Sequence, residues 1–522
     1  MEEKITYSLV DRIVIFALVV SITILCIVSS TGVVIATPLI SGYLALSENQ
    51  NIWITTGFLM VVAATVPCAI YLAEKFGYKQ AFIAGTIIYL LSSFLMGFSS
   101  NYSYFLSLRL ISGIGVGIVF PVSLSVLAQT FTKEAVNLIL VAYVALGFGL
   151  GSSLGYLCGG VVSQYYNWQP IFFLIGISGI PLVGLSHFFL KKQNLRPVGG
   201  FDFIGYALFI IFICSLIMVL ANAKAPWNTE GWRSSFILFF SLLAVVSLIA
   251  LIIEEKEKIN PLFFLELFRI ESFAIGSLIL FFIGGTFFSS ATMFPLILIN
   301  LFKYSKIQAA ITMFPYGLSM ALAGAISGFF IKEIGIRKTL LIGGALVILD
   351  SFLQHSLSIY SDRFFITTLL VIRGLGVGMT MGPVTAWSLK DIKLELKGNG
   401  SILVTIFRQV GGGLTVSWIN LFAYDRYKMH IQHFFEAFAF QKRGINKAIS
   451  DLSHHNYMNY GANPELSQEQ SKVLIIETIE RQARLLSFND AYFIIGIVMG
   501  ALFLFVAFKF VKETLRERTS KE

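Results

Sequence analysis

Four side chains that are charged at neutral pH lie well inside long apolar stretches of this sequence, where charge is otherwise rare. Asp350 is near the middle of stretch 339–357, and Arg109, Arg373 and Arg408 each interrupt another apolar run. Ionisable groups within hydrocarbon are costly and mark functional sites by default. A carboxyl group removed from water can take up and release a proton near neutral pH. The sequence therefore predicts that Asp350 carries a proton, unless it is a structural carboxylate bonded to a neighbouring helix.

The three arginines predict different roles. Arg109 would favour the ionised form of a nearby acid, and the alternative is an arginine capped by backbone carbonyl groups. Arg373 directly precedes a glycine cluster, and its alternatives are a place in a central cavity or a purely structural one. Arg408 is expected to anchor packing or to extend its charged end toward the membrane surface.

No motif of an enzyme is present. The sequence contains no Gly-x-Ser-x-Gly, His-Glu-x-x-His or phosphate-binding loop, so we predict no catalysis, no cofactor and no drive by ATP. His430-x-x-His433 and the pair His454-His455 could bind a metal. A solvated helix surface explains these histidines better, and no metal site is predicted.

The elements that position these residues are membrane-spanning helices. Of the 522 residues, 56% are hydrophobic and 13% charged, against about 25% charged in soluble domains. This composition excludes a soluble enzyme, a disordered chain and a nucleic-acid-binding protein. A helix needs about 20 apolar residues to cross a bilayer. Fourteen such stretches predict an all-α polytopic membrane protein: 13–38, 52–72, 80–98, 104–127, 136–161, 171–190, 203–221, 235–253, 273–299, 308–331, 339–357, 364–388, 400–424 and 490–510.

The net charge of +9 is best explained by topology. If the N-terminus is cytoplasmic, most of the 38 Lys and Arg residues fall in cytoplasmic segments, as the positive-inside rule requires. Both termini are therefore predicted to be cytoplasmic, and no basic patch calls for a nucleic-acid partner. The long outer segment 425–489 predicts amphipathic helices that form a periplasmic cap or a docking surface.

An internal repeat divides the chain. Gly113-Ile-Gly-Val-Gly117 corresponds to Gly374-Leu-Gly-Val-Gly378, and hairpin 72–77 corresponds to 330–335. Transporters are often built from such duplicated bundles around a midplane site. We predict an N-terminal six-helix bundle in 1–195, an inserted helix pair in 196–258 and a C-terminal six-helix bundle in 259–522.

Several motifs resemble those of the major facilitator superfamily, in its fourteen-helix drug:proton antiporter branch (the EmrB/QacA type). They are Trp53-Ile-Thr-Thr-Gly-Phe-Leu59, Leu72-Ala-Glu-Lys-Phe-Gly-Tyr-Lys79, Arg109-x-x-Ser-Gly113, Phe201-Asp-Phe-Ile-Gly205 and Arg408-Gln-Val-Gly-Gly-Gly413. The resemblance implies alternating access and export of amphipathic small molecules in exchange for protons across the inner membrane. It also implies a possible periplasmic adaptor of a tripartite efflux system.

The resemblance implies roles for two further groups of residues. Glu74, Lys75, Gly77 and Lys79 match the cytoplasmic gating hairpin, and a cluster that only sets topology is the alternative. Four glycines of the fifth apolar stretch share one helix face, because they are four residues apart: Gly147, Gly151, Gly155 and Gly159. Such a face allows close helix approach, and we expect it at the interface between the bundles.

Two departures from the branch keep alternatives open. Ser29 stands where the branch usually has an acidic residue, and Tyr156 replaces a proline of the antiporter motif, which predicts a straighter helix. A carrier of a siderophore, metabolite or lipid, with altered coupling or direction, is the second hypothesis. A transport-inactive receptor or membrane scaffold is the third.

Overall fold

In a computed structural model of the chain, the structure describes residues 7–192, 200–225, 227–258, 261–393, 396–440, 442–460 and 463–519. These residues form helices joined by short loops, with no strand among them. Thirteen helices in the described part are long and apolar enough to span a membrane. The fourteen spans expected from the sequence are therefore not all met. The exception is α12 (Ile336–Leu353), whose 18 residues include Arg337, Lys338 and Asp350.

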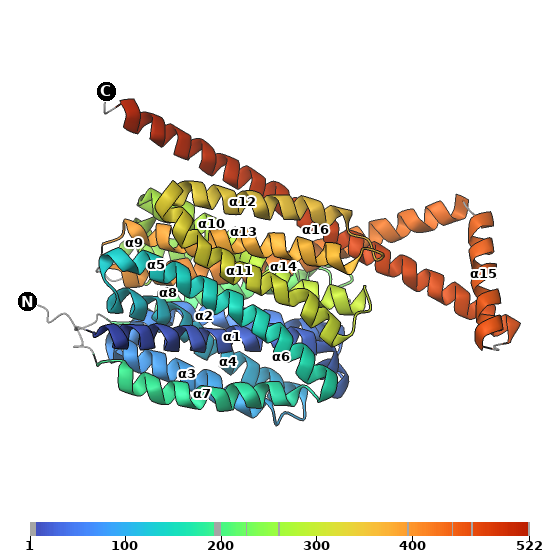
Figure 1. Cartoon of the computed structure of the whole chain (residues 1–522), viewed down its shortest axis with the longest axis horizontal. Coiled ribbons are helices and arrows are strands. Elements are labelled where there is room, and N and C mark those ends of the chain that lie inside the picture. Colours follow the sequence, from blue (N-terminus) through green and yellow to red (C-terminus); the bar gives the residue numbers. More distant parts are fainter. Residues whose placement is uncertain are drawn as a thin grey trace, which may run out of the picture.

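The first group of helices packs around α1 and α4 (Figure 1). Its members are α1 (Leu9–Tyr43), α2 (Glu48–Phe76), α3 (Tyr78–Met96), α4 (Tyr102–Thr130), α5 (Lys133–Val144), the π-helical turn η1 (Ala145–Leu150), α6 (Gly151–Tyr165) and α7 (Gln169–Phe189). Polar caps fix where helices begin. The Ser47 hydroxyl accepts a hydrogen bond from the Gln50 amide, and the Gln50 side-chain oxygen accepts one from the Ser47 amide. This capping box satisfies two amide groups that the helix leaves free.

The second group packs around α13 and α14. Its members are α10 (Glu271–Asn300), α11 (Lys306–Ile334), α12, α13 (Arg363–Lys390), α14 (Lys397–Phe440), α15 (Lys442–Tyr460) and α16 (Pro464–Thr519). α11 begins with the same capping box as α2, here between Ser305 and Gln308. α1 begins and α16 ends at the same end of the bundle (Figure 1).

Glycine contacts in the two groups follow one pattern. A Cβ on Gly115 of α4 would lie 2.6 Å from the Gly85 oxygen of α3, and a Cβ on Gly376 of α13 would lie 3.0 Å from the Gly343 oxygen of α12. These glycines hold equivalent positions of the repeated segments. The same close helix crossing is therefore built twice, as the sequence repeat predicts.

Both hairpins of the repeat turn on a glycine in a conformation that other residues rarely adopt. Gly77 joins α2 to α3 with φ +99° and ψ 143°, and Gly335 joins α11 to α12 with φ +83° and ψ 156°. Only glycine enters this region without a steric cost. The two turns therefore hold their helix pairs in the same sharp reversal.

We expect Gly77→Ala to lower the stability of the protein by about 1–3 kcal/mol, because a Cβ strains the backbone at this φ and ψ. Thermal unfolding in detergent measures the effect. Gly42→Ala is the matched control, since no atom lies within 4 Å of its new Cβ and its φ is ordinary. Equal melting temperatures for the two variants would contradict the strain argument.

The inserted pair lies at the edge of the bundle, across the junction of the two groups. α8 (Phe203–Asn222) contacts α2 on one side and α14 on the other, whereas α9 (Ser235–Glu257) packs chiefly on α8. Asp202 caps α8 by accepting from the Gly205 amide at 2.8 Å. The expected domain boundary at 195/196 lies outside the described residues, and the one at 258/259 adjoins the undescribed residues 259–260.

The segment 425–489 is not a loop in its described residues. α14 continues without a break through Phe440, α15 crosses at the tip, and α16 returns from Pro464 into the bundle. The three form a hairpin that projects from the end of the bundle opposite the start of α1 (Figure 1). The expected amphipathic segments therefore belong largely to α14 and α16, which both continue from the bundle into this hairpin.

Candidate functional site

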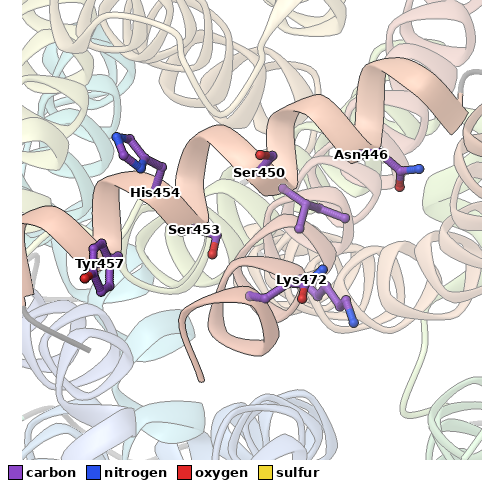
Figure 2. A pocket seen from close by; sticks show the side chains of 8 residues that line it. Asn446, Ser450, Ser453, His454, Tyr457 and Lys472 are labelled. Carbon is purple, nitrogen blue, oxygen red and sulfur yellow. The ribbon is translucent and has the colours of Figure 1, made fainter. Parts of the chain in front are cut away.

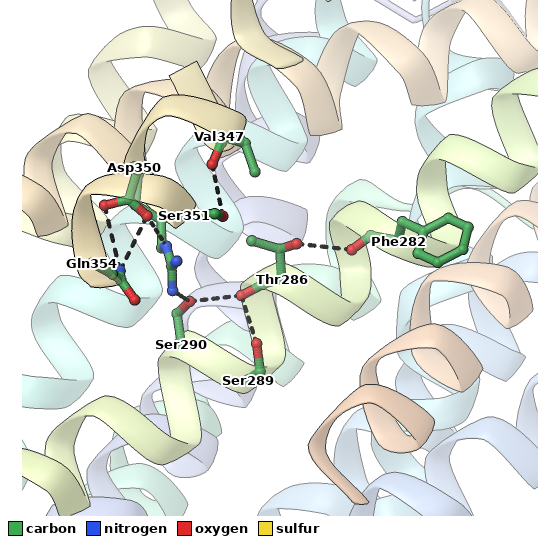
Figure 3. A network of polar contacts seen from close by, with 9 residues as sticks. Phe282, Thr286, Ser289, Ser290, Val347, Asp350, Ser351 and Gln354 are labelled. Atoms are coloured by element: carbon green, nitrogen blue, oxygen red, sulfur yellow. Dashed lines mark hydrogen bonds and ion pairs between the residues drawn. The ribbon is translucent and has the colours of Figure 1, made fainter. Parts of the chain in front are cut away.

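Asp350 forms a buried ion pair with Arg373. Arg373 Nε lies 2.5 Å from Asp350 Oδ2, and neither side chain is exposed to solvent. The Gln354 amide also donates to the carboxylate, at 3.1 Å to Oδ2 (Figure 3). Among the described residues, Asp350 is the one carboxyl residue with no exposure at all. A buried charge of this kind is kept only where a partner compensates it.

The pair is connected to the first helix of its group. Arg373 Nη1 donates to the Ser290 hydroxyl of α10 at 2.7 Å, and the guanidinium lies 4.4 Å from the ring centre of Tyr492 on α16. Ser290 in turn donates to the Thr286 carbonyl at 2.7 Å (Figure 3). Four helices therefore meet around one titratable carboxylate, and its protonation would remove the charge that compensates Arg373.

Arg109 forms a second buried cluster, in the first group of helices. Its Nη1 donates to the Ser29 hydroxyl of α1 at 3.1 Å, and its Nε lies 3.5 Å from the Ile54 carbonyl of α2. The guanidinium stacks 4.1 Å from the ring centre of Phe58. No carboxylate contacts Arg109 in the part of the chain that the structure describes. Ser29, which stands where the branch usually has an acidic residue, takes this contact instead.

Arg109 and Arg373 make similar contacts in the two halves, although their positions in the repeat differ by one helical turn. In the repeat register, Arg373 corresponds to Ser112 and not to Arg109. Each arginine nevertheless donates to a serine in the middle of the first helix of its group, Ser29 in α1 and Ser290 in α10. Of the residues predicted to couple protons, the structure brings Asp350 and Arg373 together in the second group of helices and places Arg109 in the first group.

We expect Ser29→Ala to lower the free energy of unfolding by about 1–3 kcal/mol, because one guanidinium nitrogen of Arg109 would lose its acceptor in a buried site. Thermal unfolding measures the change. Ser30→Ala is the control, because Ser30 is the next residue of α1 and its side chain lines the small central cavity and not the Arg109 cluster. A stability loss shared equally by both variants would show that the Arg109 contact contributes little.

Of the two expectations for Arg408, extension toward the membrane surface is wrong, and the buried position agrees with packing. Its side chain is fully buried, with the guanidinium 4.6 Å from the ring centre of Phe148. Phe148 belongs to η1 in the first group and Arg408 to α14 in the second. A Cβ on Gly284 of α10 would lie 2.3 Å from the Arg408 oxygen, so this part of α14 packs directly on α10.

A small cavity lies where the two groups meet, next to Gln409, the residue that follows Arg408. It has a volume of about 10 Å³ and is lined from α1, α2 and α4 on one side and by Phe288 and Gln409 on the other. That volume holds about one water molecule. The structure therefore shows the central region in a closed arrangement.

The junction of the groups runs along α5, η1, α6 and α11. Ser153 donates to the Phe314 carbonyl at 2.8 Å, and a Cβ on Gly317 would lie 2.5 Å from the Gly149 oxygen. Nearer the outer end, a Cβ on Gly160 would meet Ala310 at 2.3 Å. Small residues on both sides bring the two backbones into direct contact.

The glycine stripe expected at this junction faces another way. Cβ atoms on Gly147, Gly151, Gly155 and Gly159 would meet, in order, Thr23, Ile27, Thr31 and Gly32, all on α1. The spacing of four correctly places them on one face, but it does not identify the neighbouring helix. The junction uses the adjacent face instead. η1 interrupts this helix at 145–150, and the part that contains Tyr156 is a regular α-helix.

The residues of the expected gating hairpin make local contacts in this structure. Lys79 Nζ donates to the His187 carbonyl at the end of α7, at 2.5 Å, and Lys75 lies over the Tyr71 ring at 5.4 Å. Glu74 makes no ion pair in the part of the chain that the structure describes. Partial burial raises the pKa of the Glu74 carboxyl above its ordinary value. Protonation is therefore less costly there than on an open surface.

A larger hollow lies in the projecting hairpin and not in the bundle. It has a volume of about 370 Å³ between α15 and α16 and is lined by polar side chains, including Asn446, Ser450, His454 and Lys472 (Figure 2). Of the histidines, His430 contacts Asp490 Oδ2 at 2.8 Å, and no group that could hold a metal occurs among the described residues. This hollow is too polar and too far out to serve as a midplane site.

Sequence reasoning missed two features of the site. Gln354 and Ser290 were not singled out, because a neutral polar residue in an apolar stretch carries no signal of its partner. The isolation of Arg408 was missed because a sequence does not reveal which buried charges lack partners. The run Arg408-Gln409 in an otherwise apolar segment was the signal that could have led to it.

The chain is similar in sequence to a known family and to several bacterial transporters. A family model described as Major Facilitator Superfamily matches residues 18–416. The multidrug export protein EmrB of Haemophilus influenzae is 26% identical over 495 residues, covering 94% of both chains. EmrB of Escherichia coli K12 is 24% identical and covers 92% of both chains. The multidrug transporter protein MdtP of Bacillus subtilis is 27% identical over 70% of this chain and 67% of its own.

Solved structures share the fold at lower identity. An inward-facing, unoccupied bacterial homologue of the human lysosomal transporter Spinster matches with a TM-score of 0.61 and 14% identity, over 97% of this chain and 99% of its own. The proton:xylose symporter XylE matches with a TM-score of 0.60 and 13% identity, over 97% of both chains. At this identity the likeness concerns the arrangement of helices alone.

Proposed function

This chain belongs to the Major Facilitator Superfamily, and from that premise we propose that it exports amphipathic small molecules across the inner membrane in exchange for protons. Membership makes the chain a multi-pass secondary transporter and not an enzyme. The relatives named as multidrug exporters match along most of its length, which supports export and a cargo of this class.

The buried Asp350–Arg373 pair is the observation that carries the proposal. With no exposure at either residue, the ion pair is stable only while both partners are charged. Protonation of Asp350 would leave Arg373 with Ser290 and the Tyr492 ring. A proton taken up from the acidic side would therefore bias the packing of α10, α12, α13 and α16 toward another arrangement.

The transport cycle follows from the two helix groups. We assign the N-terminal bundle to 1–195 and the C-terminal bundle to 259–522, with 196–258 as the inserted pair, and propose that the bundles rock about a midplane site. The hairpin with Glu74, Lys75, Gly77 and Lys79 then closes the cytoplasmic side. Both termini face the cytoplasm in this scheme. The hairpin of α14, α15 and α16 projects into the periplasm, where an adaptor could dock.

Transport by the purified protein tests the proposal. The protein is reconstituted in liposomes with an imposed pH gradient and supplied with a panel of dyes, drugs and siderophores. We expect amphipathic dyes or drugs to move against their gradient, with protons moving in the opposite direction. Movement of siderophores alone would favour the second hypothesis of the sequence. No movement of any compound in either direction would contradict proton-driven export.

A further inference from the structure

Arg408 is a buried cation without a hydrogen-bonding partner. Its exposed fraction is 0%, and Nε, Nη1 and Nη2 all lack an acceptor among the residues that the structure describes. Transfer of an unpaired charge from water to an apolar interior is among the largest costs in a protein. A single cation–π contact with Phe148 is worth about 2 kcal/mol when desolvated, which compensates only part of that cost.

The other two membrane-embedded arginines show what a structural arginine looks like in this chain. Arg109 has a serine hydroxyl and a backbone carbonyl as acceptors. Arg373 has a carboxylate and a serine hydroxyl. Arg408 has neither kind of acceptor, although its helix passes close to α10. Structural packing alone therefore does not account for a guanidinium at this position.

The surroundings of Arg408 are those of a binding surface shared by both bundles. The Phe148 ring that covers it comes from the opposite bundle, and that ring also lies 5.3 Å from the ring of Phe120, which lines the small central cavity. The next residue, Gln409, has an unpaired side-chain oxygen and lines the small central cavity. Separation of the bundles would remove Phe148 from the guanidinium and leave it facing the widened cavity.

We propose that Arg408 binds the anionic group of the cargo, so that the transported compounds include amphipathic organic anions with a carboxylate. This inference rests on the proposed export function and narrows its substrate class. A guanidinium presents a planar fork of donors that matches a carboxylate with two parallel hydrogen bonds. The apolar part of the cargo would lie against aromatic walls that include Phe58, Phe120 and Phe288. Release of the anion returns Arg408 to its place over Phe148.

Binding of matched probes tests the assignment. The probes are 1-naphthoate and 1-naphthamide, which share a ring system and differ in charge. Affinities are measured by calorimetry with the full chain in lipid nanodiscs, for wild type, Arg408→Met, Arg408→Lys and the control Arg363→Met. Arg363 lies at the outer end of α13, where its Nε donates to the Thr312 hydroxyl. It thus provides the same chemical change outside the central region.

We expect wild type and Arg363→Met to bind naphthoate at least tenfold more tightly than naphthamide, about 1.4 kcal/mol. Arg408→Met should lose this preference while still binding naphthamide. Arg408→Lys should keep part of it, because the charge remains without the fork. If Arg408→Met fails to fold, the ratio of the naphthoate and naphthamide affinities in wild type and in Arg408→Lys still tests the inference.

Several results would overturn the inference. The first is equal affinity of wild type for naphthoate and naphthamide. The second is a ratio of these two affinities that Arg408→Met leaves unchanged. The third is a wild type that chloride alone stabilises, without a preference for naphthoate, and that loses this stabilisation in Arg408→Met; this result would identify a structural counter-ion. The proposed function is contradicted by a different result, namely the absence of any transport driven by a pH gradient. A protein that exports cationic dyes but ignores naphthoate would keep the proposed function and lose this inference.

Discussion

Asp350→Asn is expected to reduce export driven by a pH gradient to the level of empty liposomes, while exchange of cargo without a gradient continues. Asparagine keeps an oxygen facing Arg373 Nε but cannot gain or lose a proton. The substitution therefore removes titration and retains much of the local packing. Uptake and release of a labelled cargo, with and without an imposed pH gradient, measure both activities in the same liposomes.

The stability of the variant must be followed alongside its transport. Removal of one partner from a buried ion pair costs about 3–5 kcal/mol, so Asp350→Asn will melt at a lower temperature. The double variant Asp350→Leu with Arg373→Met removes both charges and should recover part of this loss without recovering coupling. Loss of stability and loss of coupling are thereby separated.

A matched carboxylate elsewhere provides the control. Asp362 caps α13 by accepting from the Phe364 amide at 3.0 Å, and asparagine caps a helix about as well as aspartate. Asp362→Asn should therefore leave gradient-driven export unchanged. If Asp350→Asn also exports normally against a gradient, Asp350 is structural and the proton is carried by another group.

The fold could be predicted largely from the sequence because the bilayer imposes one length and one polarity on every spanning helix. Thirteen of the expected helices are met by this criterion. The remaining one, α12, fails because Arg337, Lys338 and Asp350 lie within its 18 residues. The continuous course of α14 through Phe440 could not be predicted, since hydropathy falls at the membrane surface although the helix continues.

The partners of the buried charges were less accessible to sequence reasoning. Helical periodicity tells which residues share a face, as it does for Gly151 and Gly155, but the neighbouring helix depends on tertiary packing. The same limit applies to Arg373: its pairing with Asp350 depends on the crossing of α12 and α13. For Arg408 the sequence left packing and extension toward the membrane surface open, because a long arginine side chain allows either.

Gly149→Ala and Gly317→Ala are expected to impair transport by separating the bundles along η1, α6 and α11. A Cβ on Gly317 would lie 2.5 Å from the Gly149 oxygen, and a Cβ on Gly149 would lie 2.6 Å from the Ala321 nitrogen. Both contacts are with backbone atoms, which cannot move aside as a side chain can. Overpacking of this kind costs about 1–3 kcal/mol.

The cost falls on the closed arrangement alone, because the contact exists only while the bundles touch. A bias of 1–3 kcal/mol reduces the population of the closed state about 5- to 150-fold relative to an open one. We expect the transport rate to fall accordingly. A short cross-linker between Ser163→Cys and Lys306→Cys, in a background without the four native cysteines, reports closure at the outer end, where Lys306 Nζ lies 3.4 Å from the Ser163 carbonyl.

Two further alanine variants separate movement at the junction from packing within one bundle. A Cβ on Gly155 would clash with Thr31 of α1, in the same bundle, whereas Gly184 has open space around it. Gly155→Ala should therefore lower the melting temperature without changing the cross-linking yield, and Gly184→Ala should change neither. Since Gly149 and Gly155 lie on different faces of one interrupted helix, only Gly149→Ala should reduce cross-linking. Equal yields for these two variants would mean that the Gly149 contact with α11 is not the surface on which the bundles separate.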